Sequence, residues 1–120
     1  MKVMNVKKEF RIKRNKEFQY IFKKGKSFAN RQLVIYYMKR IDNKHFRIGL
    51  SVGKKIGNAV TRNRIKRYLR QAFHELEGEM KHEYDIVIIV RMQTKDMDFH
   101  RVKRSLTHLL RKERLLMEKK

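Results

Sequence analysis

The 120-residue sequence contains no cysteine, no proline and no tryptophan. Without cysteine, the chain cannot form disulfide bonds, thiolate nucleophiles or zinc–thiolate sites. Without proline, the ends of helices and strands have to be read from glycine, asparagine and aspartate. Carboxylates are scarce as well, because 12 Asp and Glu residues stand against 33 Lys and Arg residues.

Long apolar runs are also missing. The longest are LVIYYM at 33–38 and IVIIV at 86–90, and both are too short to cross a bilayer. The first 16 residues lack the apolar centre of a signal peptide. We therefore expect a cytoplasmic protein that has no membrane partner.

The chain is instead rich in positive charge, with a formal net charge of +21. Such a charge destabilises a compact state through self-repulsion, and a polyanionic partner relieves it. Disorder is the alternative for a highly charged chain, but 41% hydrophobic and 10% aromatic residues favour a folded protein. The length suits one domain over residues 1–120.

The pattern of apolar residues predicts an α+β protein in which helices pack on one sheet. Asn15 is the expected cap of the first helix and Gly25 its end. The strand at 84–92 is apolar enough to be central and covered on both faces. The expected elements, in the order α-β-β-β-α-β-α, are a helix over 16–24, extended chain over 27–40 that centres on 32–38, a strand over 45–52, a helix from the Asn58 cap to 76, the strand over 84–92, and a last helix that starts at Asp96 or Asp98.

The segment TRNRIKRYLRQAF at 61–73 combines a buried edge with a charged one. At 100° per residue, its apolar residues share one arc, and an adjoining arc carries Asn63, Lys66, Arg67 and Arg70. A solvated helix face is the ordinary interpretation of a charge run. However, residues 43–74 hold nine Lys or Arg and no acid, and cations in the first turns oppose the helix dipole. We therefore favour polyanion binding.

RNA suits this segment better than DNA. A helix-turn-helix needs a short helix and a tight turn before its recognition helix, whereas a strand and the basic loop GKKIGN at 53–58 precede this one. Arginine donates to phosphates in several directions, and Asn63 can reach a base edge or a 2′-hydroxyl.

The stretch AVTRNRIKRYLRQAF at 59–73 closely resembles the signature of the protein component of bacterial ribonuclease P. The segments RIKRNKEFQYIFKKGKSFANRQLVIYY, RIGLSVGKKIGNAV and DIVIIVR are also similar to segments of that family. The resemblance covers a family core at about 11–111 and leaves basic tails at 1–10 and 112–120. It implies a four-stranded sheet with an unusual left-handed βαβ crossover.

The resemblance also implies a function. The protein would be an accessory subunit of an endoribonuclease whose catalyst is an RNA subunit that uses divalent metal (Mg). That enzyme removes the 5′ leader from precursor tRNA, and the protein would bind the leader and broaden metal tolerance. The implied partners are the RNA subunit and the leader, with no protein partner and no cofactor bound by the chain.

Residue by residue, the resemblance assigns two binding surfaces and no catalytic residue. The contact with the RNA subunit falls on Arg62, Asn63, Arg64, Lys66, Arg67 and Arg70. A cleft for the leader falls on Phe18, Phe22 and Tyr36, with Lys54 and Lys55 nearby.

Alternatives remain open at this point. Phe18 and Phe22 also suit plain core packing at helical spacing, and Tyr36 has the same alternative. A general structured-RNA-binding protein, ribosomal or chaperone-like, would show the same charge. A metal-dependent nuclease is disfavoured, because the five histidines lack ligand spacing and the aspartates suit turns, caps and a strand start.

Overall fold

A computed structural model describes residues 10–117 of the chain. Its elements are α1 (Asn15–Lys24), β1 (Lys26–Ala29), β2 (Leu33–Lys39), β3 (Arg47–Ser51), α2 (Ala59–Leu76), β4 (Tyr84–Val90) and α3 (Phe99–Lys112). Short 3₁₀ turns, such as η2 (Lys54–Ile56), lie between some of them. The predicted α+β class and the order α-β-β-β-α-β-α are confirmed.

The four strands form one mixed sheet in the order β1-β2-β4-β3. The pairs β1–β2 and β2–β4 are antiparallel, whereas β3 and β4 run parallel. Parallel neighbours need a crossover connection, and α2 supplies it. The left hand of this βαβ unit stays a prediction.

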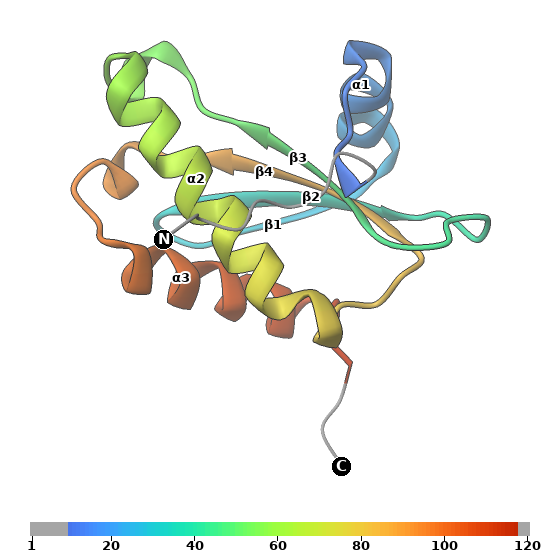
Figure 1. The fold of residues 1–120 in the computed structure, drawn as a ribbon. Coiled ribbons are helices and arrows are strands. Elements are labelled where there is room, and N and C mark those ends of the chain that lie inside the picture. Colours follow the sequence, from blue (N-terminus) through green and yellow to red (C-terminus); the bar gives the residue numbers. More distant parts are fainter. Residues whose placement is uncertain (1–9, 118–120) are drawn as a thin grey trace.

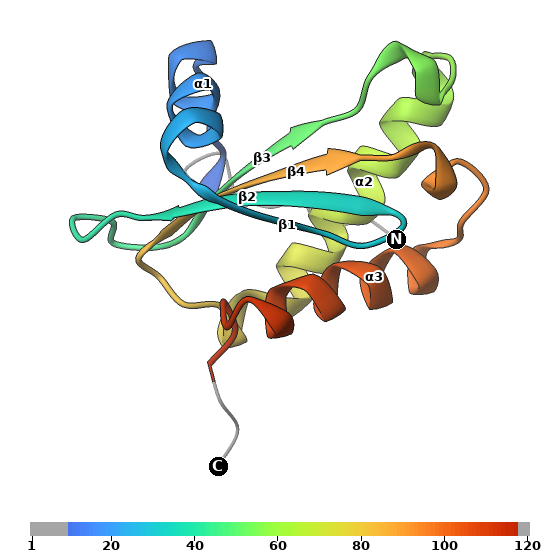
Figure 2. The ribbon, with the colours of Figure 1, turned by 180° about the vertical axis from the view of Figure 1, so that it is seen from behind.

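Helices cover the two faces of the sheet unequally (Figures 1 and 2). The helices α2 and α3 lie side by side on one face, here called the covered face, and enclose the main core. On the other face, here called the open face, α1 packs over one end of β2 and β4. The alternation of side chains along β2 follows this division, because Leu33, Ile35 and Tyr37 enter the main core whereas Tyr36 and Met38 join the cluster under α1.

The strand β4 is central, as its composition predicts. It lies between β2 and β3, and its residues 85–88 are all buried. Ile86 and Ile88 belong to the main core, and Val87 faces α1 on the other side. A strand buried on both faces needs apolar residues at successive positions, which explains the IVIIV run.

Two of the three expected helix caps are confirmed. The Asn58 side chain accepts a hydrogen bond from Thr61 N at 3.0 Å, and the Asp98 side chain accepts one from Arg101 N at 2.9 Å. The third expectation is wrong, because α1 begins at Asn15 itself. The preceding Arg14 is the extended N-cap residue and makes no side-chain bond to the helix. Packing on the sheet, rather than a capping side chain, therefore sets this end.

The chain after α3 returns to the core, although a tail was expected there. Leu115 and Leu116 are buried, and Met117 N donates to Glu79 O at 2.7 Å. Two leucines among charged residues are the sequence signal for this docking. Most of the other expected tail, 1–9, and residues 118–120 lie outside the described part of the chain.

Candidate nucleic-acid interface

The helix α2 begins at a turn that only glycine accommodates. Gly57 has φ 158° and ψ −169°, a region that is essentially restricted to glycine. A Cβ atom there would also lie 3.1 Å from two carbons of Thr61. The turn places Asn58 to cap the helix and gives α2 a fixed starting direction relative to β3.

The apolar edge of α2 is fully buried, as its periodicity predicts. Ile65, Leu69, Ala72, Phe73 and Leu76 are at most 4% exposed, and all belong to the main core. Burial of this edge fixes the rotation of the helix about its axis. The cationic arc is therefore held away from the sheet.

The six residues predicted to contact an RNA subunit all lie in α2. Asn63 and Arg67 are exposed, and the other four are half-buried. Arg62 Nε donates to Gly57 O at 3.2 Å and an Arg64 terminal nitrogen donates to Lys95 O at 2.8 Å, so both also brace the fold. The guanidinium of Arg67 lies 5.9 Å from the centre of the Tyr68 ring.

The Arg and Lys residues of α2 have no acidic partners in the described part of the chain. Among residues 10–117, no carboxylate forms an ion pair with the Arg or Lys residues of this helix. Burial lowers the pKa of Arg70, and the nearby charge of Arg11 lowers it further. Repulsion between neighbouring cations destabilises the free protein, and an anion placed between them reverses the effect.

The three aromatic residues predicted for a leader cleft meet on the open face. The Phe22 and Tyr36 rings stand edge to face with centroids 5.0 Å apart, and the Phe18 and Phe22 centroids are 6.4 Å apart. All three are half-buried and surround a small cluster of Ile12, Ile21 and Val87. They are therefore neither core residues of the main cluster nor free surface residues.

Phe18 has a packing role that the sequence did not reveal. Its ring lies on Gly49 of β3, where an added Cβ atom would be 2.5 Å from Phe18 Cζ. Glycine at this position lets the ring approach the backbone of the sheet. Phe18 therefore packs α1 directly against the backbone of the sheet.

The two lysines expected beside the cleft lie in η2, directly after β3. Lys54 and Lys55 are exposed, and the buried Ile56 anchors the turn between them and α2. They lie on the connection from the end of β3 to the start of α2. Within residues 10–117, no hydrogen bond joins either lysine to the aromatic cluster.

The sequence patterns did not reveal a buried carboxylate beside the first turn of α1. Asp85, expected only to start a strand, is 1% exposed and accepts from Arg47 Nε at 3.0 Å and from a terminal nitrogen of Arg47 at 2.7 Å. The same Arg47 nitrogen donates to Glu17 Oε2 of α1 at 2.6 Å, while Asn43 Nδ2 donates to Asp85 at 2.9 Å. Hydrogen bonding to Asp85 raises the pKa of Arg47. Because Arg47 donates to both Glu17 and Asp85, it joins α1 to the sheet. The signal in the sequence was an aspartate inside an otherwise apolar strand.

Two further findings concern metals and membranes. Within residues 10–117, no three His, Asp or Glu side chains are grouped so that they could hold a metal ion. No helix of the described segment is long and apolar enough to span a bilayer.

Comparison with known proteins shows similarity along almost the whole chain. The family model described as Ribonuclease P matches residues 6–114. The ribonuclease P protein component of Oceanobacillus iheyensis is 68% identical over 111 residues, which are 92% of each chain. That of Listeria monocytogenes is 58% identical over 114 residues, 95% of this chain and 96% of the relative.

Solved structures show the same likeness in three dimensions. The RNase P protein of Staphylococcus aureus superposes with a TM-score of 0.84 at 44% identity, over 88% of this chain and 96% of that one. The RNase P protein of Thermotoga maritima gives a TM-score of 0.78 at 33% identity, over 85% and 96% of the two chains.

Proposed function

The chain belongs to the ribonuclease P protein family, and we propose from that membership that it binds the catalytic RNA subunit through α2 and the 5′ leader of precursor tRNA on the open face. Ribonuclease P is an endoribonuclease and a ribonucleoprotein of tRNA processing, and its protein component implies an RNA subunit as partner.

The observation that carries the proposal is that the cations of α2 form no ion pairs among residues 10–117. Its buried edge fixes the helix on the sheet, so Asn63, Lys66, Arg67 and Arg70 project from one fixed backbone. Binding of phosphates therefore costs side-chain entropy but no further ordering of the helix. Arg62 and Arg64 extend the row while also bracing the start of the helix.

The open face suits a single-stranded leader for a different reason. Half-buried aromatic rings can stack on bases of any sequence, and Phe22 and Tyr36 lie together beside the uncovered part of the sheet. Lys54 and Lys55 add positive charge where β3 ends. A subunit that serves many precursor tRNAs needs such sequence-tolerant contacts.

Divalent metal enters this proposal through the RNA. The metal would be held by the RNA subunit, where it activates the attacking water. The protein's part is to supply positive charge that screens repulsion between the RNA subunit and its substrate. We propose that this charge lets the holoenzyme work at lower magnesium, with residues 11–111 as the functional core.

The test is cleavage of precursor tRNA by the protein, by the cognate RNA subunit and by both together, across a magnesium titration. We expect no cleavage by the protein alone and a lower magnesium requirement for the complex. Binding without any effect on cleavage would favour a general structured-RNA-binding protein. Robust cleavage by the protein alone would indicate a nuclease centre in the chain.

A single substitution tests the role of α2 within the same assay. Arg67→Ala should weaken binding of the RNA subunit by about 1.5–3 kcal/mol, because a charge-assisted contact is lost from an exposed position. Lys44→Ala, an equally exposed cation in the β2–β3 turn, is the matched control and should have little effect. Equal losses for both variants would mean that α2 makes no specific contact.

A further inference from the structure

The outward face of α3 carries a second row of basic residues. Arg101, Arg104, His108 and Arg111 are exposed and recur at spacings of three, four and three, which places them on one side of the helix. The row spans about 15 Å at 1.5 Å of rise per residue. Residues 99–112 include no acid. Of the acids next to the helix, Asp98 accepts from Arg101 N and Glu113 accepts from the Tyr37 hydroxyl, and within residues 10–117 neither forms an ion pair with the row.

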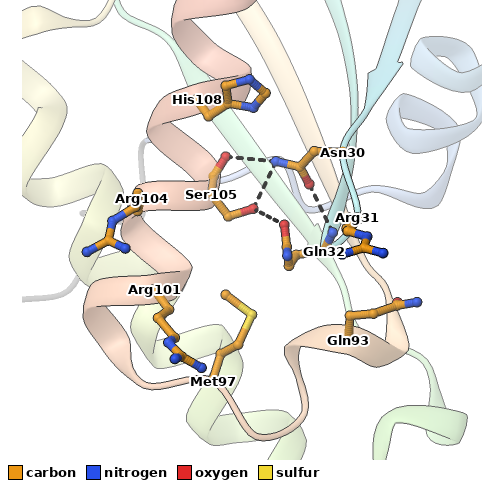
Figure 3. A pocket seen from close by; sticks show the side chains of 9 residues that line it. All are labelled: Asn30, Arg31, Gln32, Gln93, Met97, Arg101, Arg104, Ser105 and His108. Atoms are coloured by element: carbon orange, nitrogen blue, oxygen red, sulfur yellow. Dashed lines mark hydrogen bonds between the residues drawn. The ribbon is translucent and has the colours of Figure 1, made fainter.

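A pocket of about 670 Å³ opens beside this row, between α3 and the β1–β2 turn (Figure 3). Its rim includes Arg31, Arg101 and Arg104. A second pocket of about 680 Å³ shares Arg104 and His108 and continues along the helix to Arg111 and Lys112. The two pockets are separate but meet at Arg104 and His108, and together they are here called the trough.

Polar side chains joined by hydrogen bonds form one wall of the first pocket (Figure 3). Asn30 Nδ2 donates to Ser105 Oγ at 2.9 Å and to Ser105 O at 3.1 Å. Ser105 Oγ donates to Gln32 Oε1 at 3.1 Å. This fixes the orientation of the Gln32 amide and leaves its nitrogen as a donor with no partner among the described residues.

The first pocket lies on the opposite flank of the helical layer from the cations at Lys66 and Arg70. Arg70 approaches Arg11, which bridges to Ile48 at the β3 edge. Ser105 instead bonds Asn30 in the β1–β2 turn. Between the flanks, Glu75 of α2 pairs with Lys103 of α3 at 2.7 Å.

We propose that α3 is a second RNA-binding surface, which holds a single-stranded RNA segment different from the one bound by α2. Phosphates would lie along Arg101, Arg104, His108 and Arg111. One nucleotide would enter the pocket, with its base edge accepting from the Gln32 amide. The proposal rests on the proposed function only in that the partner is RNA.

Chemistry favours RNA over other polyanionic partners. An oriented amide beside arginines matches a base linked to a phosphate, and the pocket volume is in the range of small-ligand sites. At about 3.4 Å per phosphate along a duplex strand, a row of 15 Å reaches about four phosphates. The row has no bulky apolar residues of the kind that insert into a membrane surface.

The chain has no cysteine, so a single introduced cysteine can carry an iron chelate that cuts nearby RNA. We would place it at Thr107, which lines the trough, at the exposed Val60 beside the α2 surface, and at Lys39 as a distant control. In the assembled holoenzyme, cuts from residue 107 should fall in an RNA segment separate from the cuts from residue 60.

The outcomes separate this proposal from the proposed function. Cuts from residue 60 without cuts from residue 107 above the residue 39 background would overturn the second surface alone. Cuts at the same nucleotides from both positions would also overturn it. If neither position cuts, both proposals fail.

Charge removal gives an independent measurement on the full chain. Arg101→Gln combined with Arg104→Gln should weaken binding of the RNA subunit about tenfold and reduce the slope of log K against log salt by about 1.4–1.8, as expected for two lost phosphate contacts. Lys39→Gln combined with Lys44→Gln removes the same charge from the β2–β3 side and should leave the slope unchanged. Unchanged melting temperatures would show that all variants fold, and equal changes for the two pairs would overturn the proposal.

Discussion

Two neighbouring tyrosines of β2 show how differently the two faces of the sheet are used. Tyr37 points into the main core on the covered face, and its hydroxyl donates to Glu113 Oε1 at 2.8 Å. Tyr36 points to the open face, where its half-buried ring stands beside Phe22. One face is closed by two helices, whereas α1 covers only part of the other (Figure 2).

The two faces of the sheet therefore have different roles, because the covered face carries most of the folding stability and the open face carries the proposed leader site. The covered face buries the apolar edges of α2 and α3, so most of the hydrophobic stabilisation resides there. The open face keeps aromatic rings accessible and attaches α1 by a charged cluster. Substitutions on the two faces should therefore damage different properties.

The largest effect is expected from Phe73→Ala on the covered face. Phe73 is fully buried and stacks on Phe46, so its truncation leaves a cavity and should lower the free energy of unfolding by about 3–5 kcal/mol. Denaturant unfolding measures the loss. RNA-subunit binding and leader binding should decline together, and a loss below 1 kcal/mol would show that this face does not carry the stability.

A slightly smaller effect is expected from Arg47→Gln at the attachment of α1. The substitution leaves the buried Asp85 carboxylate without its main partner, at a cost of about 3 kcal/mol. The matched control is Arg40→Gln, because Arg40 is 3.6 Å from Asp85 but more exposed, and its loss should be at most about 1 kcal/mol. Equal losses in denaturant unfolding would show that Arg47 is not the residue that ties α1 to the sheet.

Phe22→Ala sharpens the comparison, because its effect should appear in binding rather than in folding. If Phe22 stacks on a base, affinity for precursor tRNA with a leader should fall by about 1–3 kcal/mol, while mature tRNA and the RNA subunit are bound as before. Binding curves with and without leader, together with a melt of the variant, decide the outcome. Equal losses for both tRNAs and a collapsed melting temperature would make Phe22 a core residue.

The smallest effect is expected from Tyr37→Phe, which removes one hydrogen bond at a cost of about 0.5–1.5 kcal/mol. Burial, followed by the contact with Glu113, raises the pKa of Tyr37 from 10.0 to about 12. The unfolded chain therefore loses this proton first, and the stability associated with it is present below pH 10 and lost as the pH rises to about 12. Unfolding curves between pH 9 and 12 should fall more steeply for the parent protein than for Tyr37→Phe, and parallel curves would argue against a buried Tyr37 hydroxyl.

Local patterns predicted much of this structure because they depend on neighbours in the sequence. The caps at Asn58 and Asp98, the buried edge of α2 and the central strand β4 all follow from periodicities of 3.6 and 2 or from short-range hydrogen bonds. The resemblance to a family then brought Phe18, Phe22 and Tyr36 together as one group. Their roles in binding stay predictions.

Features that depend on distant segments were not predictable in this way. The pairing of Asp85 with Arg47 joins residues 38 positions apart, and the docking of Leu115 depends on the turn at Lys81. The trough on α3 was missed because its polar wall comes from the β1–β2 turn. At Asn15 a local preference failed as well, because the residue predicted to cap α1 is the first residue of the helix.

The parallel pairing of β3 with β4 has a consequence for the kinetics of folding. The helix that carries most of the proposed RNA contacts is also the connection that closes this strand pair. Such non-local pairing forms slowly, because the entropy of closing the connection is lost before the strand contacts form. We therefore expect the sheet to be completed when α2 docks with its cations side by side, and a polyanion present during folding to lower the electrostatic barrier to that step.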